Sequence, residues 1–426
     1  MLIQYVFYTF DARYKTNTLL LILKIMKRQL LFILCAIVYV SIASAQHRSS
    51  CQSKRFINTN NSQADINAPI IVSTTPTSEG EAVYTLRPII RIEYDEELNW
   101  DEDKNSNCIT ITDANCTEYA GKVTHNVVHD KSVIHFYFSN DLPLDKALLV
   151  KVSGGLSDLF GNTTEDFYFR FLSEYRPMIT QETILTLDNT TGWWPPNGSG
   201  STKGLTAEDS DNTWDVSSSV TASQESESSC WLHYAFNPTS TDGLWQIRQY
   251  YSSGSTTSHN NINGILSFWL YGDASNNSVS AMLRATSSSG GLKYQDPQTK
   301  IDFRGWKLIT WDLKNDAYTS FTGTDALTAI WRFDSFFLRH ITESNIDTEW
   351  NGDLYFDNLE FNTWDNSATR KAQLNDVKIP ASNIEDITSF NNEPIEYFNP
   401  QGIKVNKPQK GIYIKRQGSA ITKIVL

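Results

Sequence analysis

Residues 167–171 read Phe167-Tyr168-Phe169-Arg170-Phe171, with an aromatic ring at every second position. Successive side chains of a β-strand point to opposite faces, so this stretch predicts a strand that buries one face. The same alternation occurs at residues 90–94 and 133–138, and segments rich in turn residues separate these stretches. Short strands at this spacing over roughly 100 residues predict a β-sandwich across residues 66–173.

Longer strand candidates, rich in aromatic residues, follow between residues 177 and 363. The clearest are Gly305–Leu313 and Tyr355–Phe361, and loops of Ser, Asn and Gly separate them. No segment of helical period competes with these strands. We therefore predict an all-β chain in which a second β-sandwich follows the first.

Length and composition limit the class of protein. The 426 residues predict two or three domains, and the 40% of hydrophobic residues supply ample core. The 36 Lys and Arg residues against 48 Asp and Glu residues give a formal net charge of −12 at pH 7. Because nucleic-acid binding depends on clustered basic residues, this balance excludes nucleic acid as the partner.

The first 45 residues have the pattern of a secretory signal peptide. A basic pair at 27–28 precedes an apolar run over 30–43, and small residues at 43–45 form a cleavage pattern. Such a signal starts naturally at Met26, with residues 1–25 upstream of the true start. No later segment has the roughly 18 consecutive apolar residues of a transmembrane helix. The sequence thus predicts export.

The motifs of residues 66–173 resemble the bacterial Ig-like domain of S-layer and other surface proteins. The most specific is an Asp-x-x-Gly-Asn turn that precedes the aromatic strand 167–171. The resemblance implies an Ig-like β-sandwich that serves as a spacer. The motifs are Pro76 followed by Gly80, Ile90–Tyr94, Leu142-Pro143-Leu144, and Val150–Gly154 leading into Asp158-Leu159-Phe160-Gly161-Asn162.

Residues 177–363 resemble the galactose-binding-like jelly roll of carbohydrate-binding modules. The matching strands are Leu185–Asp188, Gly305–Leu313 and the closing strand Tyr355–Phe361. The resemblance implies a jelly-roll β-sandwich that binds a polysaccharide or glycan. It also implies a structural calcium ion, since hard carboxylate oxygens suit calcium. The implied ligands are Asp188 and Asp357, with Glu208, Asp209 and Asp211 as weaker candidates.

Asp357 is the most informative of these carboxylates. On the strand 355–361 it alternates onto the face of Leu359 and Phe361, so a core-facing register buries it. A buried carboxylate is costly unless it is paired or bound to metal. The alternative to calcium is hydrogen bonding to loop amides.

Eight aromatic residues lie in or beside polar loops of this second module. Flat rings stack on the apolar face of a pyranose, while nearby amide, carboxylate and guanidinium groups bond its hydroxyls. The sequence predicts a stacking site formed by some of the eight, and packing on the sandwich core is the alternative for each ring. They are Trp193, Trp194, Trp214, Trp245, Tyr250, Tyr251, Trp331 and Trp350.

The C-terminal part of the chain divides into a linker and a small β segment. Residues 364–383 are polar and without clear period, and four short strand candidates follow within 384–426. The motifs Asn399-x-x-Gly402-x-x-Val405 and Gly411-Ile412-Tyr413 resemble the C-terminal sorting segment of Bacteroidetes-type surface proteins. The resemblance implies export and sorting machinery as partners. It places the protein in the medium or on the outer-membrane exterior of a Gram-negative bacterium.

Two groups of reactive residues leave alternatives open. His125, His129 and His135 fall on a predicted hairpin, where they either converge on a metal or are solvated side chains of an exposed sheet. Cys108 and Cys116 are close enough in sequence to form a disulfide in an oxidising compartment, and unpaired thiols are the equal alternative.

Common catalytic motifs are absent from the sequence. It contains no His-Glu-x-x-His, no Gly-x-Ser-x-Gly and no phosphate-binding glycine loop. We therefore predict a non-catalytic protein that binds carbohydrate through its jelly roll. A structural or adhesive surface protein without sugar binding is the first alternative. A glycoside hydrolase is the second, because its two carboxylates need only converge in space.

Overall fold

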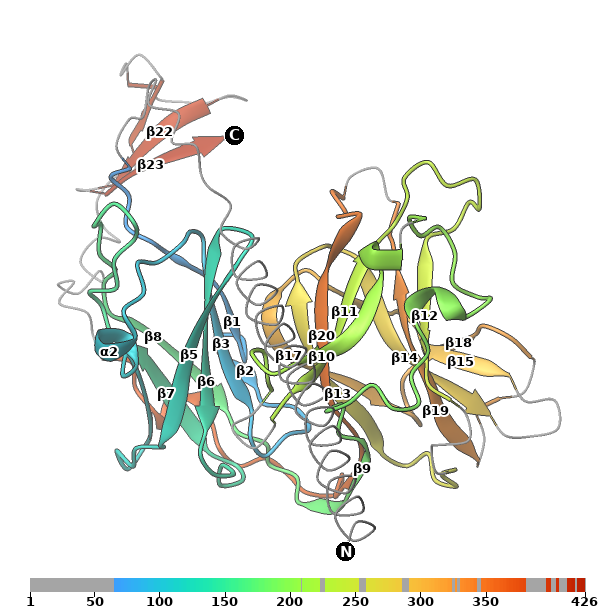
Figure 1. Ribbon diagram of the computed structural model, residues 1–426. Coiled ribbons are helices and arrows are strands. Elements are labelled where there is room, and N and C mark those ends of the chain that lie inside the picture. The colour runs from blue at the N-terminus through green and yellow to red at the C-terminus, as the bar shows by residue number, and fades with distance from the viewer. Residues whose placement is uncertain are drawn as a thin grey trace, which may run out of the picture. The chain divides into compact units, whose positions relative to one another are not determined.

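The computed structural model describes residues 65–380 with short gaps, and four stretches near the C-terminus. The gaps are residues 208, 223–226, 253–257, 286–290, 324–325, 328–329 and 343–345, and the C-terminal stretches are 396–399, 404–405, 412–417 and 420–425. The predicted signal peptide, residues 1–45, lies outside the described residues. Strands dominate the described part, so the predicted all-β fold class is confirmed (Figure 1).

Two four-stranded sheets form the first sandwich. One has the strand order β1-β3-β6-β5 and the other β2-β8-β7-β4. The alternation of residues 167–171 holds, because Phe169 and Phe171 are fully buried in the core between the sheets. The strands are β1 (Ile71–Thr75), β2 (Gly80–Glu81), β3 (Ile89–Tyr94), β4 (Ile109–Asp113), β5 (Gly121–Val128), β6 (Lys131–Phe138), β7 (Ala147–Val152) and β8 (Phe167–Leu172).

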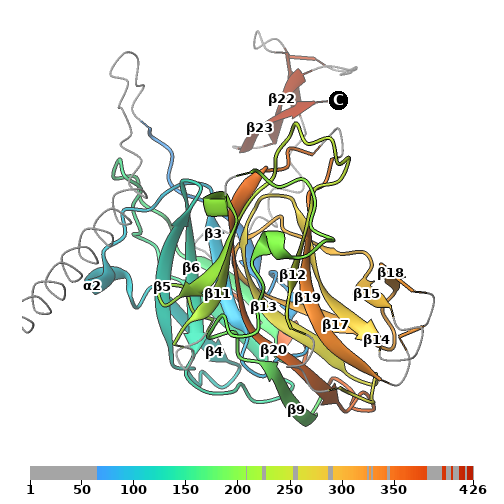
Figure 2. The same cartoon turned by 45° about the vertical axis from the view of Figure 1, so that its right-hand side comes forward.

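Two larger sheets form the second sandwich (Figure 2). The front sheet has the order β10-β11-β20-β13-β17, with β9 paired to β20, and the back sheet has the order β12-β19-β14-β15-β18, with β16 paired to β14. The strands are β9 (Met178–Leu185), β10 (Thr213–Ser217), β11 (Ser229–Ala235), β12 (Gln246–Tyr250), β13 (Ile265–Asp273), β14 (Ser278–Ala285), β15 (Leu292–Gln295), β16 (Thr299–Lys300), β17 (Arg304–Asp312), β18 (Tyr318–Ser320), β19 (Trp331–Arg339) and β20 (Asn351–Trp364).

Bulges in β19 and β20 determine which side chains face outward. Phe333 and Phe336 both enter the core, as do Phe356 and Leu359, although strict alternation would separate them. The strand register shifts at both places, and Asn358 has a φ of 45°. An extra residue in a strand redirects the side chains that follow it.

The two sandwiches are joined by polar contacts between β3, β6 and β17. Glu93 Oε1 lies 2.7 Å from Arg304 Nη1, and Arg91 Nη1 donates to the carbonyl of Arg304 over 3.0 Å. His135 is fully buried at this contact. The alternative that its imidazole is solvated is therefore wrong, because β17 covers the face of β6 that alternation predicted to be exposed.

The segment predicted to be a linker returns along the first sandwich. The backbone N–H groups of Lys371 and Ala372 donate to the carboxylate of Asp145, and Val377 is buried beside Leu172. The prediction did not anticipate these contacts. In the part of the terminal segment that is described, β21 (Glu396–Phe398), β22 (Ile412–Gln417) and β23 (Ala420–Val425) form a three-stranded sheet.

Helices are short throughout the described residues. They are α2 (Glu102–Asn105), η1 (Pro196–Gly198), η2 (Asp209–Asp211) and η3 (Leu374–Asp376). None of the helices described here has the length and apolar character needed to cross a membrane. The described cysteines Cys108, Cys116 and Cys230 are thiols, not disulfides.

Candidate functional site

The structure separates the eight predicted aromatic residues by burial. Trp331 is 0% exposed and Tyr251 is 8% exposed, so neither presents a ring face to a saccharide. Their assignment to a stacking site is therefore wrong. Trp331 begins β19 and stacks on His259 beneath the sheet edge, with its Nε1 donating to the carbonyl of Asn261 over 2.8 Å.

Trp193 and Trp214 are partly buried on the core of the second sandwich. Their ring centroids are 4.5 Å apart, and Trp193 stacks on Phe336 at 5.7 Å. Trp245 and Trp350 are also partly buried against that core, with centroids 5.4 Å apart, and His340 stacks on Trp350 at 3.7 Å. These four rings are engaged chiefly with other rings.

Trp194 and Tyr250 form the most accessible pair. Trp194 is 46% exposed, and its ring meets Tyr250 edge-on with centroids 4.9 Å apart. Its backbone is fixed to β12, because its N–H donates to the carbonyl of Tyr250 and its carbonyl accepts from Gln249 Nε2. The prolines at 195 and 196 restrict the chain that follows. The pair is therefore preformed.

Two arginines meet one carboxylate beside this pair, on the outer face of the back sheet. Arg248 Nε and Nη2 lie 2.9 and 2.7 Å from Asp334 Oδ2, and Arg284 Nη2 lies 3.0 Å from Oδ1. Arg248 also lies 4.7 Å from the centroid of the Tyr250 ring. Because Asp334 is buried and holds both guanidinium groups, their outer N–H groups are held in fixed directions. We call Trp194, Tyr250, Arg248, Arg284 and Asp334 the arginine–aromatic surface.

A second polar group of aromatic residues lies on the outer face of the front sheet. Trp231 stacks on Tyr355 with centroids 6.5 Å apart and donates from Nε1 to Asp353 Oδ1 over 2.8 Å. His233 Nδ1 lies 2.8 Å from the same oxygen, and that hydrogen bond raises the pKa of His233. Sequence analysis missed these residues, although their alternation with buried Cys230 and Leu232 was a usable signal.

The two predicted calcium ligands lie on neighbouring segments. The N–H of Asn358 donates to the carbonyl of Thr186 over 3.3 Å, which brings the chain at Asp357 beside the chain at Asp188. Cys230 Sγ donates to the carbonyl of Asn189 over 3.4 Å, and burial, followed by the charges of Asp357 and Asp188, raises the pKa of this thiol. Among the described residues, Asp188 Oδ1 is buried without a hydrogen-bond partner, and such an oxygen suits a cation.

Asp357 fits the calcium prediction less simply. It is fully buried, but its oxygens accept from the N–H groups of Ala222 and Asn358 at 3.1 and 2.8 Å. Its predicted face is wrong, because the bulge at Asn358 places it opposite Trp269 rather than on the face of Leu359. Of the weaker candidates, Asp211 is described, and Glu208 and the side chain of Asp209 lie outside the described residues.

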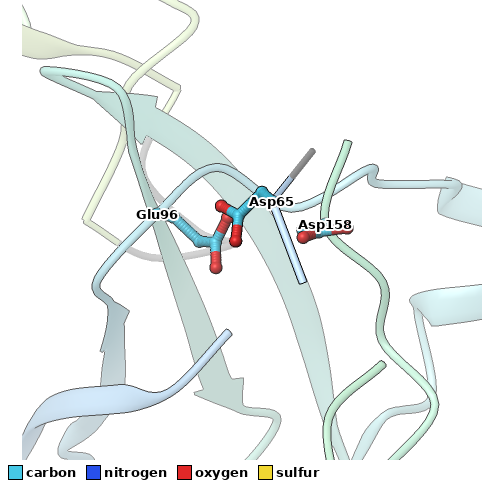
Figure 3. Close-up of side chains that lie close together, drawn as sticks. All are labelled: Asp65, Glu96 and Asp158. Atoms are coloured by element: carbon cyan, nitrogen blue, oxygen red, sulfur yellow. The ribbon is translucent and has the colours of Figure 1, made fainter. Parts of the chain in front are cut away.

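Three carboxylates converge in the first sandwich, at Asp65, Glu96 and Asp158 (Figure 3). One ligand oxygen from each lies within 4.8 Å of the others. Burial, together with the charges of Asp158 and Asp65, raises the pKa of Glu96. Asp158 is the first residue of the Asp-x-x-Gly-Asn turn, and its carboxylate accepts from the N–H groups of Phe160 and Asn162. This turn accounts for the position of Asp158 without a cation.

Comparison with known protein families finds a match within the first sandwich. Residues 65–172 match the family model of the bacterial Ig-like domain. This match confirms the resemblance found for residues 66–173. No curated protein sequence matches the chain.

Two solved structures illustrate what the chain is similar to. The N-terminal part of the bacterial S-layer protein SbsC is 13% identical with a TM-score of 0.21, and the likeness covers 41% of this chain and 42% of that one. The CBM27-1 module of Caldicellulosiruptor saccharolyticus, solved with mannohexaose, is 11% identical with a TM-score of 0.24, covering 43% of this chain and 96% of the module. At these TM-scores the likenesses do not bear on function.

Proposed function

We propose that this chain is an exported, non-catalytic surface protein that binds a glycan through its second sandwich. The arginine–aromatic surface is the observation that carries the proposal. Trp194 offers an exposed indole face, and its Nε1 has no hydrogen-bond partner among the described residues. A ring of this kind stacks on the C–H face of a pyranose and donates to one of its hydroxyls.

The neighbouring arginines supply directional donors for the same ligand. Asp334 fixes Arg248 and Arg284, so little side-chain entropy is lost when a sugar hydroxyl binds them. The side chain of Arg284 is 30% exposed, which leaves its guanidinium within reach of a ligand. Asp334 neutralises one of the two positive charges, so the surface keeps a net charge of +1 beside its hydrogen-bond donors.

The other parts of the chain have supporting roles in this proposal. The Ig-like sandwich acts as a spacer between the binding module and its attachment. Calcium at Asp188 and Asp357 is structural and stabilises the loops around β20. Location in the medium or on the cell surface follows from the predicted signal peptide and sorting segment.

The test is binding of the full chain to a glycan array and to insoluble polysaccharides. We expect binding to at least one glycan, with a loss of about tenfold or more in affinity for Trp194→Ala and for Arg284→Ala. Phe160→Ala is the matched control, because Phe160 is a 63% exposed ring on the first sandwich. Binding that survives Trp194→Ala, or that Phe160→Ala removes equally, would contradict the proposal.

A structural or adhesive role is the second candidate. The observation that favours it is the engagement of Trp193, Trp214, Trp245 and Trp350 with the core and with other rings, which leaves few ring faces for a sugar. Failure of the full chain to bind any glycan or polysaccharide tested would favour this role.

A further inference from the structure

A groove of about 550 Å³ lies on the outer face of the front sheet, beside the contact between the two sandwiches. Ser267 and Trp269 of β13 and Glu360 and Asn362 of β20 line it. The strand register places Ser267 directly opposite Glu360, so these side chains form one continuous floor. The volume falls in the range of about 300–1,000 Å³ that is usual for small-ligand sites.

Residues of the first sandwich form the second wall of the groove. Tyr84, Arg87 and Tyr137 line that wall. On the same outer face, Tyr271 and Trp306 are covered by the first sandwich and are 4% and 1% exposed. The first sandwich thus covers the β17 side of the face and leaves the β9 side open as a groove.

Two groups on the floor lack partners within the chain. Ser267 is 4% exposed, and its Oγ has no hydrogen-bond partner in the described part of the chain. Trp269 Nε1 likewise has none among the described residues, whereas Trp231 and Trp331 both donate theirs. Neither atom is among the buried unpaired groups of the described residues, so both can be reached by the hydroxyls of a ligand in the groove.

Each charged side chain that lines the groove already has a partner within the chain. Arg87 Nε lies 3.1 Å from Asp141 Oδ1, and the two oxygens of Glu360 accept from Gln181 Nε2 and Asn362 Nδ2. Among the lining residues, Arg87 is the one cation and Asp141 and Glu360 are the two carboxylates. An anionic ligand would meet a net negative wall and is disfavoured.

We propose that this groove binds a neutral oligosaccharide, with Trp269 as its stacking ring. The floor of the groove presents an indole face, a hydroxyl, and amide and carboxylate oxygens. These are the groups that recognise a pyranose. The groove contains none of the eight aromatic residues predicted from the sequence, and it lies on the front sheet, whereas the arginine–aromatic surface lies on the back sheet. It is therefore a second site, in addition to the one in the proposed function.

The test is isothermal titration calorimetry of the full chain carrying Trp194→Ala, with mannohexaose, cellohexaose and xylohexaose as probes. We expect one of the three to bind at one site per chain, and Trp269→Ala to weaken that binding about tenfold or more. Trp231→Ala is the matched control, because Trp231 lies on the same outer face but outside the groove. Trp269→Phe keeps a flat ring and should retain most of the affinity.

Glu360→Gln is the second variant, because it keeps the shape of the floor and removes a charged acceptor. We expect it to weaken binding several-fold while the circular dichroism spectrum stays that of the parent. Unchanged binding in both Trp269→Ala and Glu360→Gln would overturn the proposal that the groove binds an oligosaccharide. If the Trp194→Ala chain binds none of the three hexasaccharides, the groove proposal falls. The proposed function falls only if the unmodified chain also binds nothing on the glycan array and no polysaccharide.

Discussion

The backbone N–H of Trp306 donates a hydrogen bond to Nε2 of His135 over 2.9 Å. Because Nε2 accepts, the imidazole is neutral and carries its proton on Nδ1. The bond joins β17 of the second sandwich to β6 of the first, and both residues are almost wholly buried. It is a hydrogen bond that water cannot easily replace.

His135→Ala should therefore destabilise the chain by about 1–3 kcal/mol or more, since a buried N–H is left without an acceptor. Urea unfolding of the full chain, followed by fluorescence, measures the change in the free energy of unfolding. The control is His129→Asn, because His129 is exposed at the hairpin turn with a φ of 52°, which Asn adopts readily. A similar loss in both variants would contradict a specific role for His135.

Stability should also depend on pH below neutrality. Burial, followed by the charge of Arg91, lowers the pKa of His135 to about 3, and burial lowers that of His125 to about 4. The unfolded chain takes up these protons near pH 6.5, so it binds more protons than the folded chain below that value. The contribution of these two histidines to the free energy of unfolding is complete above pH 6.5. It decreases as the pH falls, by at most about 1.4 kcal/mol per pH unit for each histidine.

Urea unfolding at pH 7, 6 and 5 measures this dependence. This pH range lies above the range in which most carboxylates titrate. His233 acts in the opposite direction, because its hydrogen bond to Asp353 raises its pKa. His135→Ala should flatten the decrease; an unchanged pH dependence in that variant would show that other groups cause it.

The sequence was sufficient for the central strands of both sandwiches, but the strand predicted at Leu185–Asp188 was wrong, because β9 ends at Leu185 and a loop follows it. Residues 167–171 alternate as predicted, because a two-residue period needs no knowledge of distant neighbours. The alternation failed at Asp357, where a bulge inserts a residue that no local pattern indicates. The sequence analysis also did not single out Trp269 as a binding residue. Its neighbours Phe268 and Leu270 are core residues, so alternation places the Trp269 indole on the outer face of the sheet.

The binding surfaces could not be predicted from local patterns. Asp334 meets Arg248 and Arg284 from 86 and 50 positions away, through strand pairings that only the tertiary fold determines. Trp331 looked like a loop residue, but it is covered by His259 and Phe361, which are distant in sequence. Whether a ring on a strand end is exposed depends on such long-range neighbours.

Calcium should raise the midpoint of thermal unfolding relative to the same chain in EDTA. A ligand that binds only the folded chain stabilises it by about 2.7 kcal/mol at a concentration of 100 times its Kd. Asp188→Asn should remove most of this effect, since it replaces the buried charged oxygen that lacks a partner. Differential scanning calorimetry with and without calcium measures it.

Glu96→Gln is the control for that experiment, because it alters the carboxylate cluster of the first sandwich and leaves Asp188 intact. Stabilisation lost in Glu96→Gln but kept in Asp188→Asn would place the ion in the first sandwich. No difference between calcium and EDTA in the parent chain would end the calcium proposal.

Gly305 should tolerate no side chain, because the first sandwich lies directly against it. A Cβ at this position would lie 2.5 Å from His135 Nε2 and 2.8 Å from Val133 Cγ1, and its φ is +85°. Gly155 is a matched control, with a φ of +87° and no heavy atom within 4 Å of a built Cβ. Gly155→Ala should cost only the left-handed strain, about 1–2 kcal/mol.

Gly305→Ala should cost that strain and a further amount of about 1–3 kcal/mol, because His135 must move and lose its bond to Trp306. Urea unfolding of both variants gives the difference. A double-mutant cycle with His135→Ala separates the two causes: if the clash with the imidazole dominates, Gly305→Ala should cost less in the His135→Ala background, with a coupling of about 0.5 kcal/mol or more. An equal loss in the free energy of unfolding for Gly305→Ala and Gly155→Ala would contradict a close contact between Gly305 and the His135 imidazole. Strict additivity of Gly305→Ala with His135→Ala would contradict it as well.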